Sequence, residues 1–348
     1  MSKKYDYAVF IGRFQPFHIG HYHVVSKALE IAKEVILVIG SHNRPRDIRN
    51  PFTTSERVEI ISSTGLDMSR IHIAPQVDHT YNDDRWIASI QASVETIIFN
   101  SYTASPVNIC MIGYDKDHSS YYLKKFPQWD LVQIEEKFLD ADATTFRRSL
   151  FVGVYGKGDI IDDKMVVNEK HLSTIYKYVE PILPSINAEW THVDKYKEQW
   201  SKAPYPPTFN TVDAVVTQAG HILLVERKAM PGEGLWALPG GFLNQHETLL
   251  EGVLRELTEE TKIKVPKPVL VGSIAKERTY DAPNRSVRGR TITHAFHFKL
   301  SDMETGLPKV KGSDDARKAF WLPYSTLLQS RDRMFEDHFD IISHMLAF

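Results

Sequence analysis

Two histidines three residues apart, His18 and His21, lie in the segment GRFQPFHIGH (12–21), which directly follows an apolar strand-like run and opens a helix. The free N–H groups and dipole of a helix start favour anions, by roughly 0.3–1 kcal/mol per well-placed charge. Gly20 lets a phosphate approach the backbone, and Arg13 adds a permanent charge. These residues favour nucleotidyl transfer, in which catalysis consists of positioning and charge neutralisation. Simple capping of a helix is the alternative.

Three glutamates form a second group, Glu256, Glu259 and Glu260. At 100° per residue, Glu259 and Glu260 lie about 60° and 40° to either side of Glu256, so the carboxylates share one helix face. Their mutual repulsion costs roughly 0.2–0.5 kcal/mol per pair unless a cation neutralises them, and Mg²⁺ prefers such oxygen ligands. A solvated acidic helix is the alternative. The fixed spacing to three upstream residues favours the metal site; they are Gly241, Glu247 and Arg255.

A basic, glycine-containing stretch in the second half contains Arg278, Arg288 and Arg290 and precedes a strand-like run. Guanidinium groups are suited to phosphate and ribose contacts. Basic hairpin tips are as often simply solvated, so the residues alone leave both interpretations open.

The elements that must position the first group alternate between strands and helices, which predicts an open, mostly parallel α/β sheet. Such sheets bind ligands at the carboxyl ends of their strands. The turn at 113–118 has this ligand-side position, although a solvated turn explains it nearly as well. The expected strands are 7–11, 35–39, 71–74 and 107–112, and the expected helices are 21–33 and 86–99.

The residue composition changes between Pro181 and Asn210, where prolines flank a polar helix-like stretch. We therefore expect domains at 1–185 and 207–348 with a linker at 186–206, in keeping with about 150 residues per domain. The second domain is expected to be α+β. Its elements are a hairpin around Ala219-Gly220 with alternating Val212, Ala214 and Val216, a helix at 246–262, strands at 291–299 and 319–322, and a closing helix with Phe335, Phe339, Ile342 and Leu346 on one face.

The composition of the chain argues against some classes of binding partner. The net charge of −2 and the lack of a basic stripe with interleaved aromatics argue against nucleic acid, and no run approaches the roughly 20 apolar residues of a membrane span. The single cysteine, Cys110, lies in an apolar run and forms no intrachain disulfide. We expect a cytoplasmic protein, and the sequence leaves open whether it forms a homo-oligomer.

The first half resembles the nucleotidyltransferase superfamily through its His-x-Gly-His motif, and within it the archaeal-type nicotinamide mononucleotide (NMN) adenylyltransferases. Supporting stretches are 48–53 with Glu56-Arg57, Asn82 with Trp86, and 143–148. The resemblance implies a Rossmann-like fold with catalytic His18, His21 and Arg147. It implies that Asn82 and Trp86 hold nicotinamide, and that ATP and its phosphates are bound, with Mg²⁺, by Gly12, Arg13, Gly20, Arg49, Thr144 and Arg147. Asp142 and Ala143 depart from the usual Ser and Gly.

The second half resembles the Nudix box, approached by LWALPGG (235–241). The resemblance implies a Nudix fold in which Glu256, Glu259 and Glu260, with the Gly240 carbonyl, hold Mg²⁺ or Mn²⁺. Glu256 and Glu259 are the implied catalytic residues, and Glu247 and Arg255 a structural pair. Lys262 replaces the usual glycine after the helix, which predicts either a residue at positive φ costing about 1 kcal/mol or a different helix end. The basic stretch resembles ADP-ribose-cleaving Nudix domains, so Arg278, Arg288 and Arg290 are expected to bind ADP-ribose.

Both resemblances together imply a bifunctional enzyme that makes NAD from ATP and NMN and hydrolyses ADP-ribose to AMP and ribose 5-phosphate. Its partners would be these small nucleotides. Two alternatives stay open. The first half could use another acceptor, such as pantetheine phosphate or flavin mononucleotide. The second half could sense ADP-ribose or NAD without cleaving it.

Overall fold

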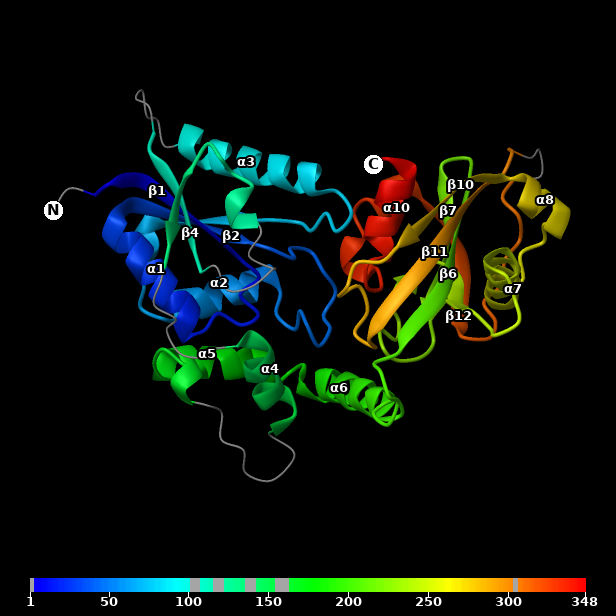
Figure 1. The fold of residues 1–348 in the computed structure, drawn as a ribbon, viewed down its shortest axis with the longest axis horizontal. Helices are drawn as coiled ribbons and strands as arrows, with labels where there is room; N and C mark the ends of the chain where they lie inside the picture. The colour runs from blue at the N-terminus through cyan, green and yellow to red at the C-terminus, as the bar shows by residue number, and fades with distance from the viewer. Residues whose placement is uncertain (1–2, 101–106, 115–121, 135–141, 154–162, 303–305) are drawn as a thin grey trace. The chain divides into compact units, whose positions relative to one another are not determined.

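A computed structural model describes residues 3–348 apart from 101–106, 115–121, 135–141, 154–162 and 303–305. The chain divides into two compact units, Met1–Asn187 and Ala188–Phe348 (Figure 1). The division falls inside helix α6 (Leu183–Glu198), so the segment 186–206 that the sequence suggested as a linker is helical as far as Glu198.

Within its described residues, the first unit is built on a five-stranded parallel sheet in the order β3-β2-β1-β4-β5. This confirms the expected α/β, Rossmann-like architecture. The strands are β1 (Tyr5–Gly12), β2 (Ala32–Ile39), β3 (Ile71–Pro75), β4 (Ile109–Gly113) and β5 (Asp130–Gln133). The helices are α1 (Ile19–Ile31), α2 (Thr54–Ser62), α3 (Asp83–Asn100), α4 (Ala143–Phe151) and α5 (Glu169–Val179), with short 3-10 turns η1 (Met68–Arg70) and η4 (Asp163–Met165).

Alternating strand residues cover both faces of this sheet, as expected when helices lie on each side. Val9 and Ile36 belong to the cluster that packs against Ile90 and Val94 of α3. Ala8 and Phe10 point the opposite way and are equally buried. The register aligns Gly12 of β1 with Ile39 of β2, so the carboxyl ends of the two central strands lie side by side.

Within its described residues, the second unit has a seven-stranded mixed sheet whose main path is β10-β11-β6-β7-β12, while β8 pairs with β7 and β9 with β6. The expected α+β class is confirmed. Its strands are β6 (Thr208–Gln218), β7 (His221–Arg227), β8 (Trp236–Ala237), β9 (Gly240–Phe242), β10 (Ile274–Tyr280), β11 (Arg290–Lys299) and β12 (Ala316–Pro323). Its helices are α7 (Leu249–Thr261), α8 (Lys267–Gly272), α9 (Tyr324–Leu327) and α10 (His338–Leu346), with the turn η5 (Arg331–Arg333). Over the described parts of the whole chain, no helix combines the length and apolarity that crossing a bilayer would require.

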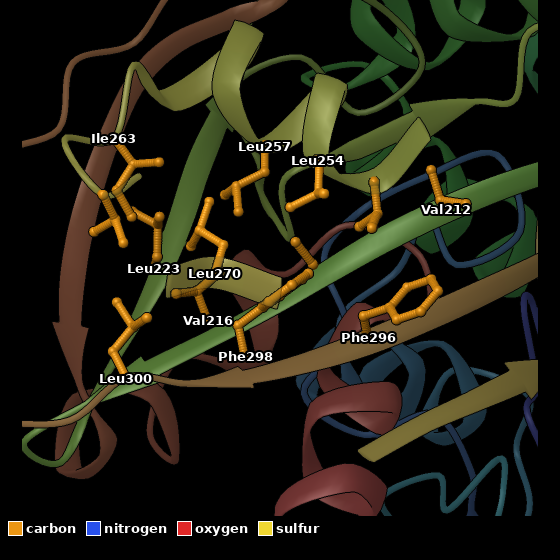
Figure 2. Close-up of a cluster of buried hydrophobic side chains, with 13 residues drawn as sticks. Val212, Val216, Leu223, Leu254, Leu257, Ile263, Leu270, Phe296, Phe298 and Leu300 are labelled. Atoms are coloured by element: carbon orange, nitrogen blue, oxygen red, sulfur yellow. The ribbon is translucent and has the colours of Figure 1, made fainter. Parts of the chain in front are cut away.

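Helix α7 packs its apolar face on the sheet, and this contact fixes the direction of the opposite, acidic face. Figure 2 shows Leu254 and Leu257 pointing toward Val216, Phe296 and Phe298 of the sheet. Figure 1 shows α10 on the other side of the same sheet. The carboxylates of α7 are therefore directed away from the large core.

The structure places three of the expected elements with small shifts. The hairpin between β6 and β7 turns at Ala219 and Gly220, both at positive φ (46° and 71°). Helix α7 begins at Leu249 rather than 246 because Thr248 caps it, its side chain accepting from the Glu251 N–H. Helix α1 occupies 19–31 rather than 21–33 because His18 caps it.

The end of α7 decides between the two alternatives for Lys262. The residue has φ 47° and ψ 32°, the left-handed conformation, with its N–H bonded to the Thr258 carbonyl. Any side chain with a Cβ is disfavoured in this conformation by about 1 kcal/mol.

Lys262→Gly should therefore raise the free energy of unfolding of the second unit by about 0.5–1 kcal/mol, because Lys262 is exposed and loses little packing. Urea unfolding of the full chain, followed by far-UV circular dichroism, measures the shift. Lys264→Gly is the matched control: Lys264 is also exposed but is not among the residues at positive φ, so glycine there should lower stability. Equal effects of the two substitutions would contradict the explanation.

Candidate active sites

The histidine pair occupies the first turn of α1. The Nδ1 of His18 accepts the Gly20 N–H (3.2 Å), and the Nδ1 of His21 accepts the His18 N–H (3.3 Å), which together form a capping box. The two rings stack with centroids 3.8 Å apart. Since both Nδ1 atoms accept hydrogen bonds, the proton of each neutral ring lies on Nε2. Each imidazole therefore presents its Nε2–H as a hydrogen-bond donor.

The turn that carries the histidines is tied to the neighbouring loop by Gln15, a residue that the sequence did not single out. The side chain of Gln15 donates to the Phe52 carbonyl (2.8 Å) and accepts from the Phe52 N–H (3.0 Å). Phe52 belongs to the second resembling stretch, 48–53. The paired amide contacts fix the distance between these two loops in the first unit.

Two buried arginines hold the strand ends. Arg57, 1% exposed, donates to the carbonyls of Arg13 (2.6 Å) and Gly40 (2.7 Å), which follow β1 and β2 respectively. Burial lowers the pKa of Arg57 to about 10. The guanidinium therefore stays charged at neutral pH and pulls the carboxyl ends of the central strands together.

Arg147, expected to face the ATP phosphates, is bonded mainly to backbone carbonyls of the first unit. It is 3% exposed and donates to the carbonyls of Gln15 (2.7 Å) and Ile48 (3.2 Å) and to the Thr144 hydroxyl (3.1 Å). Burial, together with the nearby charges of Arg13 and Arg49, lowers its pKa to about 10. In this arrangement, Arg147 acts mainly as a brace between α4 and the histidine turn.

The other residues expected at the phosphates lie around this brace. Arg13 is exposed, Arg49 half-buried and Thr144 exposed at the start of α4. Gly12 closes β1, where its carbonyl accepts the Gly40 N–H (2.9 Å). Asp142, which departs from the family pattern, caps α4 by accepting from the Thr145 N–H (2.9 Å). The structure therefore brings a group of positive charges to the capped turn.

The expected nicotinamide residues lie at the start of α3. Asn82 accepts the Arg85 N–H (2.9 Å) through its side-chain oxygen, and its amide nitrogen can still donate. Trp86 is half-buried against Tyr122 and Phe126, with ring centroids 6.3 and 6.1 Å away. Tyr122 donates to the carbonyl of Ile11 near the end of β1 (3.3 Å). Of the turn 113–118, residues 115–118 lie outside the described residues.

In the second unit, Arg255 holds the carboxylates of α7. It donates to Glu247 (2.6 and 2.9 Å), to Glu256 (2.8 Å) and to Glu259 (3.1 Å). Its hydrogen bonds lower the pKa of Glu247 to about 2. Glu247 and Arg255 form the ion pair that the sequence indicated. The remaining hydrogen bonds of Arg255 hold Glu256 and Glu259 beside this pair.

Glu260 points differently from the other two glutamates. It is 7% exposed and accepts the Gly240 N–H (3.0 Å), and burial raises its pKa to about 8. Burial also raises the pKa of Glu256. A Cβ at Gly241 would lie 2.6 Å from Glu256 Oε1, so glycine leaves the room that the Glu256 carboxylate occupies where β9 meets α7.

The donor set at β9 and α7 fits a divalent cation in chemistry. Carboxylate oxygens and a backbone carbonyl are ligands that Mg²⁺ and Mn²⁺ prefer. Within the described ranges, no three His, Cys, Asp or Glu side chains are already gathered as a metal cluster, because Arg255 binds two of the carboxylates and Gly240 the third. Residues that would hold an ion are Gly240, Glu256, Glu259 and Glu260.

A cleft opens beside Gly240 and Glu260, and one of the three arginines expected to bind ADP-ribose lines it. Arg288 lines it, together with Arg227 and Arg285, which the sequence did not put forward. Arg278 and Arg290 are not among its lining residues. Arg278 donates to His344 (3.0 Å), and Arg290 donates to the Asp281 carbonyl. These two guanidiniums are held by neighbouring chain rather than directed at the cleft.

The cleft also contains buried polar groups that come from distant parts of the sequence. His338 accepts the Leu238 N–H (2.9 Å) through Nδ1, and burial lowers its pKa. Asp213 is buried and accepts the Thr293 hydroxyl. No short motif links residues 213 and 338, so sequence spacing offered no signal for them.

Comparisons with known proteins match both units. Residues 9–102 match the cytidylyltransferase-like family, and residues 207–345 match the NUDIX domain family. The nicotinamide/nicotinic acid mononucleotide adenylyltransferase of Acinetobacter baylyi (strain ATCC 33305 / BD413 / ADP1) is 40% identical over 152 residues, which are 43% of this chain and 78% of that protein. The ADP-ribose pyrophosphatase of Methanocaldococcus jannaschii is 35% identical over 116 residues, 33% of this chain and 62% of that protein.

Two solved structures of a bifunctional NMN adenylyltransferase/ADP ribose pyrophosphatase from Francisella tularensis are similar over both units. One of them is complexed with AMP and a manganese ion. Its TM-score is 0.90 at 37% identity, and the match covers 99% of each chain. The chain belongs to this bifunctional family. Membership in the bifunctional family agrees with two separate groups of polar residues, the stacked histidines of the first unit and the α7 carboxylates of the second.

Another buried group of the first unit supports the histidine turn. His171 of α5 is fully buried and accepts the Val167 N–H (3.2 Å). Burial lowers its pKa to about 4, and the nearby backbone of Phe17, next to His18, opposes this shift. The neutral ring is the form compatible with the folded unit.

Protonation of His171 should therefore destabilise the first unit. Because the folded pKa of His171 lies below the unfolded value, stability is present above about pH 6.5 and lost as the pH falls toward 4. We expect about 2 kcal/mol of this loss between pH 7.5 and pH 5. His171→Asn keeps an acceptor for Val167 and should reduce the loss by this amount, measured by urea unfolding at both pH values. Exposed His192→Asn is the control, and an unchanged pH dependence in His171→Asn would refute the assignment.

Proposed function

We propose that this chain transfers AMP from ATP to nicotinamide mononucleotide, giving NAD and pyrophosphate, and hydrolyses ADP-ribose to AMP and ribose 5-phosphate. The observation that carries the proposal is the pair of opposite sites: stacked imidazoles and arginines at the strand ends of the first unit, and grouped carboxylates beside a cleft in the second. The 99% coverage of the bifunctional Francisella enzyme supports assigning both activities to one chain.

In the first site, the chain positions phosphates and neutralises their charge. The nucleophile, a phosphate oxygen of the mononucleotide, is already ionised, so no protein base is required. It bonds to the α-phosphorus of ATP as the bond from that phosphorus to the pyrophosphate oxygen breaks. The Nε2–H groups of His18 and His21 and the charge of Arg13 offset the growing negative charge. A divalent cation would enter with the nucleotide phosphates.

Arg57, Arg147 and Gln15 hold these groups in place, and Asn82 with Trp86 is the proposed nicotinamide site. An amide donor beside an indole favours a flat heteroaromatic carboxamide over pantetheine phosphate. The Acinetobacter relative is named for both nicotinamide and nicotinic acid mononucleotides, so we propose that either serves as acceptor. Flavin mononucleotide is the remaining alternative, and a screen of acceptors with ATP separates these candidates.

In the second site, water attacks one phosphorus of ADP-ribose and the P–O–P bridge breaks. When bound by Glu256, Glu259, Glu260 and the Gly240 carbonyl, Mg²⁺ or Mn²⁺ would supply Lewis-acid neutralisation of the diphosphate. Glu256 or Glu259 accepts the proton of the attacking water, while Glu247 and Arg255 keep α7 and β9 in register. Three grouped carboxylates favour hydrolysis over pure sensing. We also propose a cytoplasmic location, with which the free buried thiol of Cys110 is compatible.

His18→Asn should reduce NAD synthesis about 100-fold or more while leaving ADP-ribose hydrolysis unchanged. Asparagine is a good helix cap and can still accept the Gly20 N–H, so the loss would report the missing Nε2 donor rather than an unfolded helix. Both activities are measured on the same full-length preparation. His23→Asn on the same helix is the control. A parallel loss of both activities would contradict separate sites.

Glu259→Gln should reduce metal-dependent ADP-ribose hydrolysis on the order of 100-fold and leave NAD synthesis intact. The control is Glu251→Gln on the same helix, where glutamine also serves in the capping box with Thr248. Release of AMP from ADP-ribose, followed chromatographically with Mg²⁺ or Mn²⁺ and with chelator, gives the comparison. Full turnover by Glu259→Gln would remove this carboxylate from the mechanism.

A further inference from the structure

The segment 236–240 joins β8 to β9 and ends on Gly240, whose carbonyl is a proposed ligand of the divalent cation. Its three central residues are buried. The Ala214 N–H of β6 donates to the Pro239 carbonyl (2.8 Å), and the Gly240 N–H donates to Glu260 (3.0 Å). Backbone groups in such a buried segment are nearly always paired, so its other polar groups need partners as well.

Two of these partners come from the C-terminal part of the chain. The Phe335 N–H donates to the Trp236 carbonyl (2.8 Å), and the Leu238 N–H donates to Nδ1 of His338 (2.9 Å). Trp236 also forms an isolated parallel bridge with Met334. Since Trp236 and Leu238 are two residues apart, their backbone groups point to the same edge of an extended chain. The turn that leads into α10 therefore binds this edge of the segment.

The residues that make these contacts have support of their own within the second unit. Asp337, next to His338, binds Arg285 through both carboxylate oxygens (2.9 Å each), and both side chains are buried. The guanidinium of Arg227 lies over the Phe335 ring, 4.0 Å from its centroid. Neither contact involves β8 or β9. The start of α10 is therefore anchored independently of its hydrogen bond to Leu238.

The hydrogen bond with Leu238 assigns the two ring nitrogens of His338. Nδ1 accepts and is therefore unprotonated, so the proton of the neutral ring is on Nε2. The ring lines the cleft and is 7% exposed. Two roles can be distinguished: Nδ1 can hold the backbone, or Nε2 can contact a ligand. The structure shows the first contact, and Leu238 lies only two residues before Gly240.

We propose that His338 is a positioning residue for the divalent cation of the second site. Through Nδ1 it fixes the backbone from Leu238 to Gly240, which keeps the Gly240 carbonyl beside the α7 carboxylates before an ion binds. A ligand that is already in place does not have to be ordered when the ion arrives, so the affinity for the ion is higher. The proposal rests on the proposed hydrolase function and extends it to the C-terminal segment.

The test compares His338→Asn with His338→Gln in the full chain. Asparagine carries its acceptor oxygen at the level of Nδ1 and glutamine at the level of Nε2, so only asparagine can keep the Leu238 contact. Calorimetric titration with Mn²⁺, without nucleotide, should give a dissociation constant about tenfold higher for His338→Gln and changed less than about twofold for His338→Asn. The Mn²⁺ concentration for half-maximal ADP-ribose hydrolysis should shift in parallel, with kcat at saturating Mn²⁺ changed less than about twofold.

His297→Gln is the matched control. His297 is also buried in the second unit, but it is bonded to the Thr217 side chain (2.8 Å) and does not line the cleft. Its replacement should leave the dissociation constant of Mn²⁺ unchanged. Titration of Glu256→Gln identifies the part of the heat signal that belongs to this site.

Equal Mn²⁺ affinities in the two His338 variants would overturn the proposal, and a loss confined to His338→Asn would move the role to Nε2 and overturn it too. If His338→Gln does not fold, His338→Asn decides, because the proposal requires it to keep the parent affinity. A parent chain that binds Mn²⁺ but releases no AMP from ADP-ribose would refute the hydrolase function, while the titrations still decide the role of His338. A parent titration identical to that of Glu256→Gln would refute the proposal, since no ion would be held at this site.

Discussion

The carboxyl ends of parallel strands leave backbone carbonyls without a partner in the sheet, and the first unit depends on how this need is met. Arg57 supplies donors to the carbonyls of Arg13, Gly40 and Ser41, and Arg147 does the same for Gln15 and Ile48. Buried carbonyls without partners would each cost about 1–3 kcal/mol. The same guanidiniums add positive charge beneath the turn, so the groups that satisfy the backbone carbonyls also make this part of the unit electropositive.

In the second unit, an arginine holds carboxylates rather than backbone carbonyls. Arg255 is surrounded by Glu247, Glu256 and Glu259, and its charge allows carboxylates to lie together on one helix face. Like charges at this spacing repel, and the guanidinium removes the cost before any cation is present. In each unit the arginine with the most hydrogen bonds holds other groups in position, whereas Arg13 is exposed and Arg288 is half-buried.

The sequence was most informative where function depends on short spacing. The His18–His21 turn, the α7 carboxylates and the β6–β7 hairpin are local patterns, and the structure has these elements within a few residues of the expected bounds. Strands β5 and β10 were missed because most of their side chains are exposed, so no alternation of apolar and polar residues marks them. The sequence also could not predict which way the side chains of Arg147, Arg278 and Arg290 point. An arginine has the same letter whether it donates to backbone carbonyls, to a histidine or to a ligand, and only tertiary packing decides.

The net charge of −2 does not reveal that the two units carry local charges of opposite sign at their candidate sites. The first site carries its counter-charge permanently, because arginines with pKa values of about 10 remain ionised across the physiological range. The second site is acidic and borrows part of its neutralisation from Arg255. A cation arriving there must compete with a guanidinium for Glu256 and Glu259. Glu247 limits this competition, since its two hydrogen bonds keep Arg255 beside the helix when the other carboxylates turn away. The Glu247–Arg255 pair therefore stabilises the α7 carboxylates when no cation is bound and still leaves Glu256 and Glu259 able to bind one.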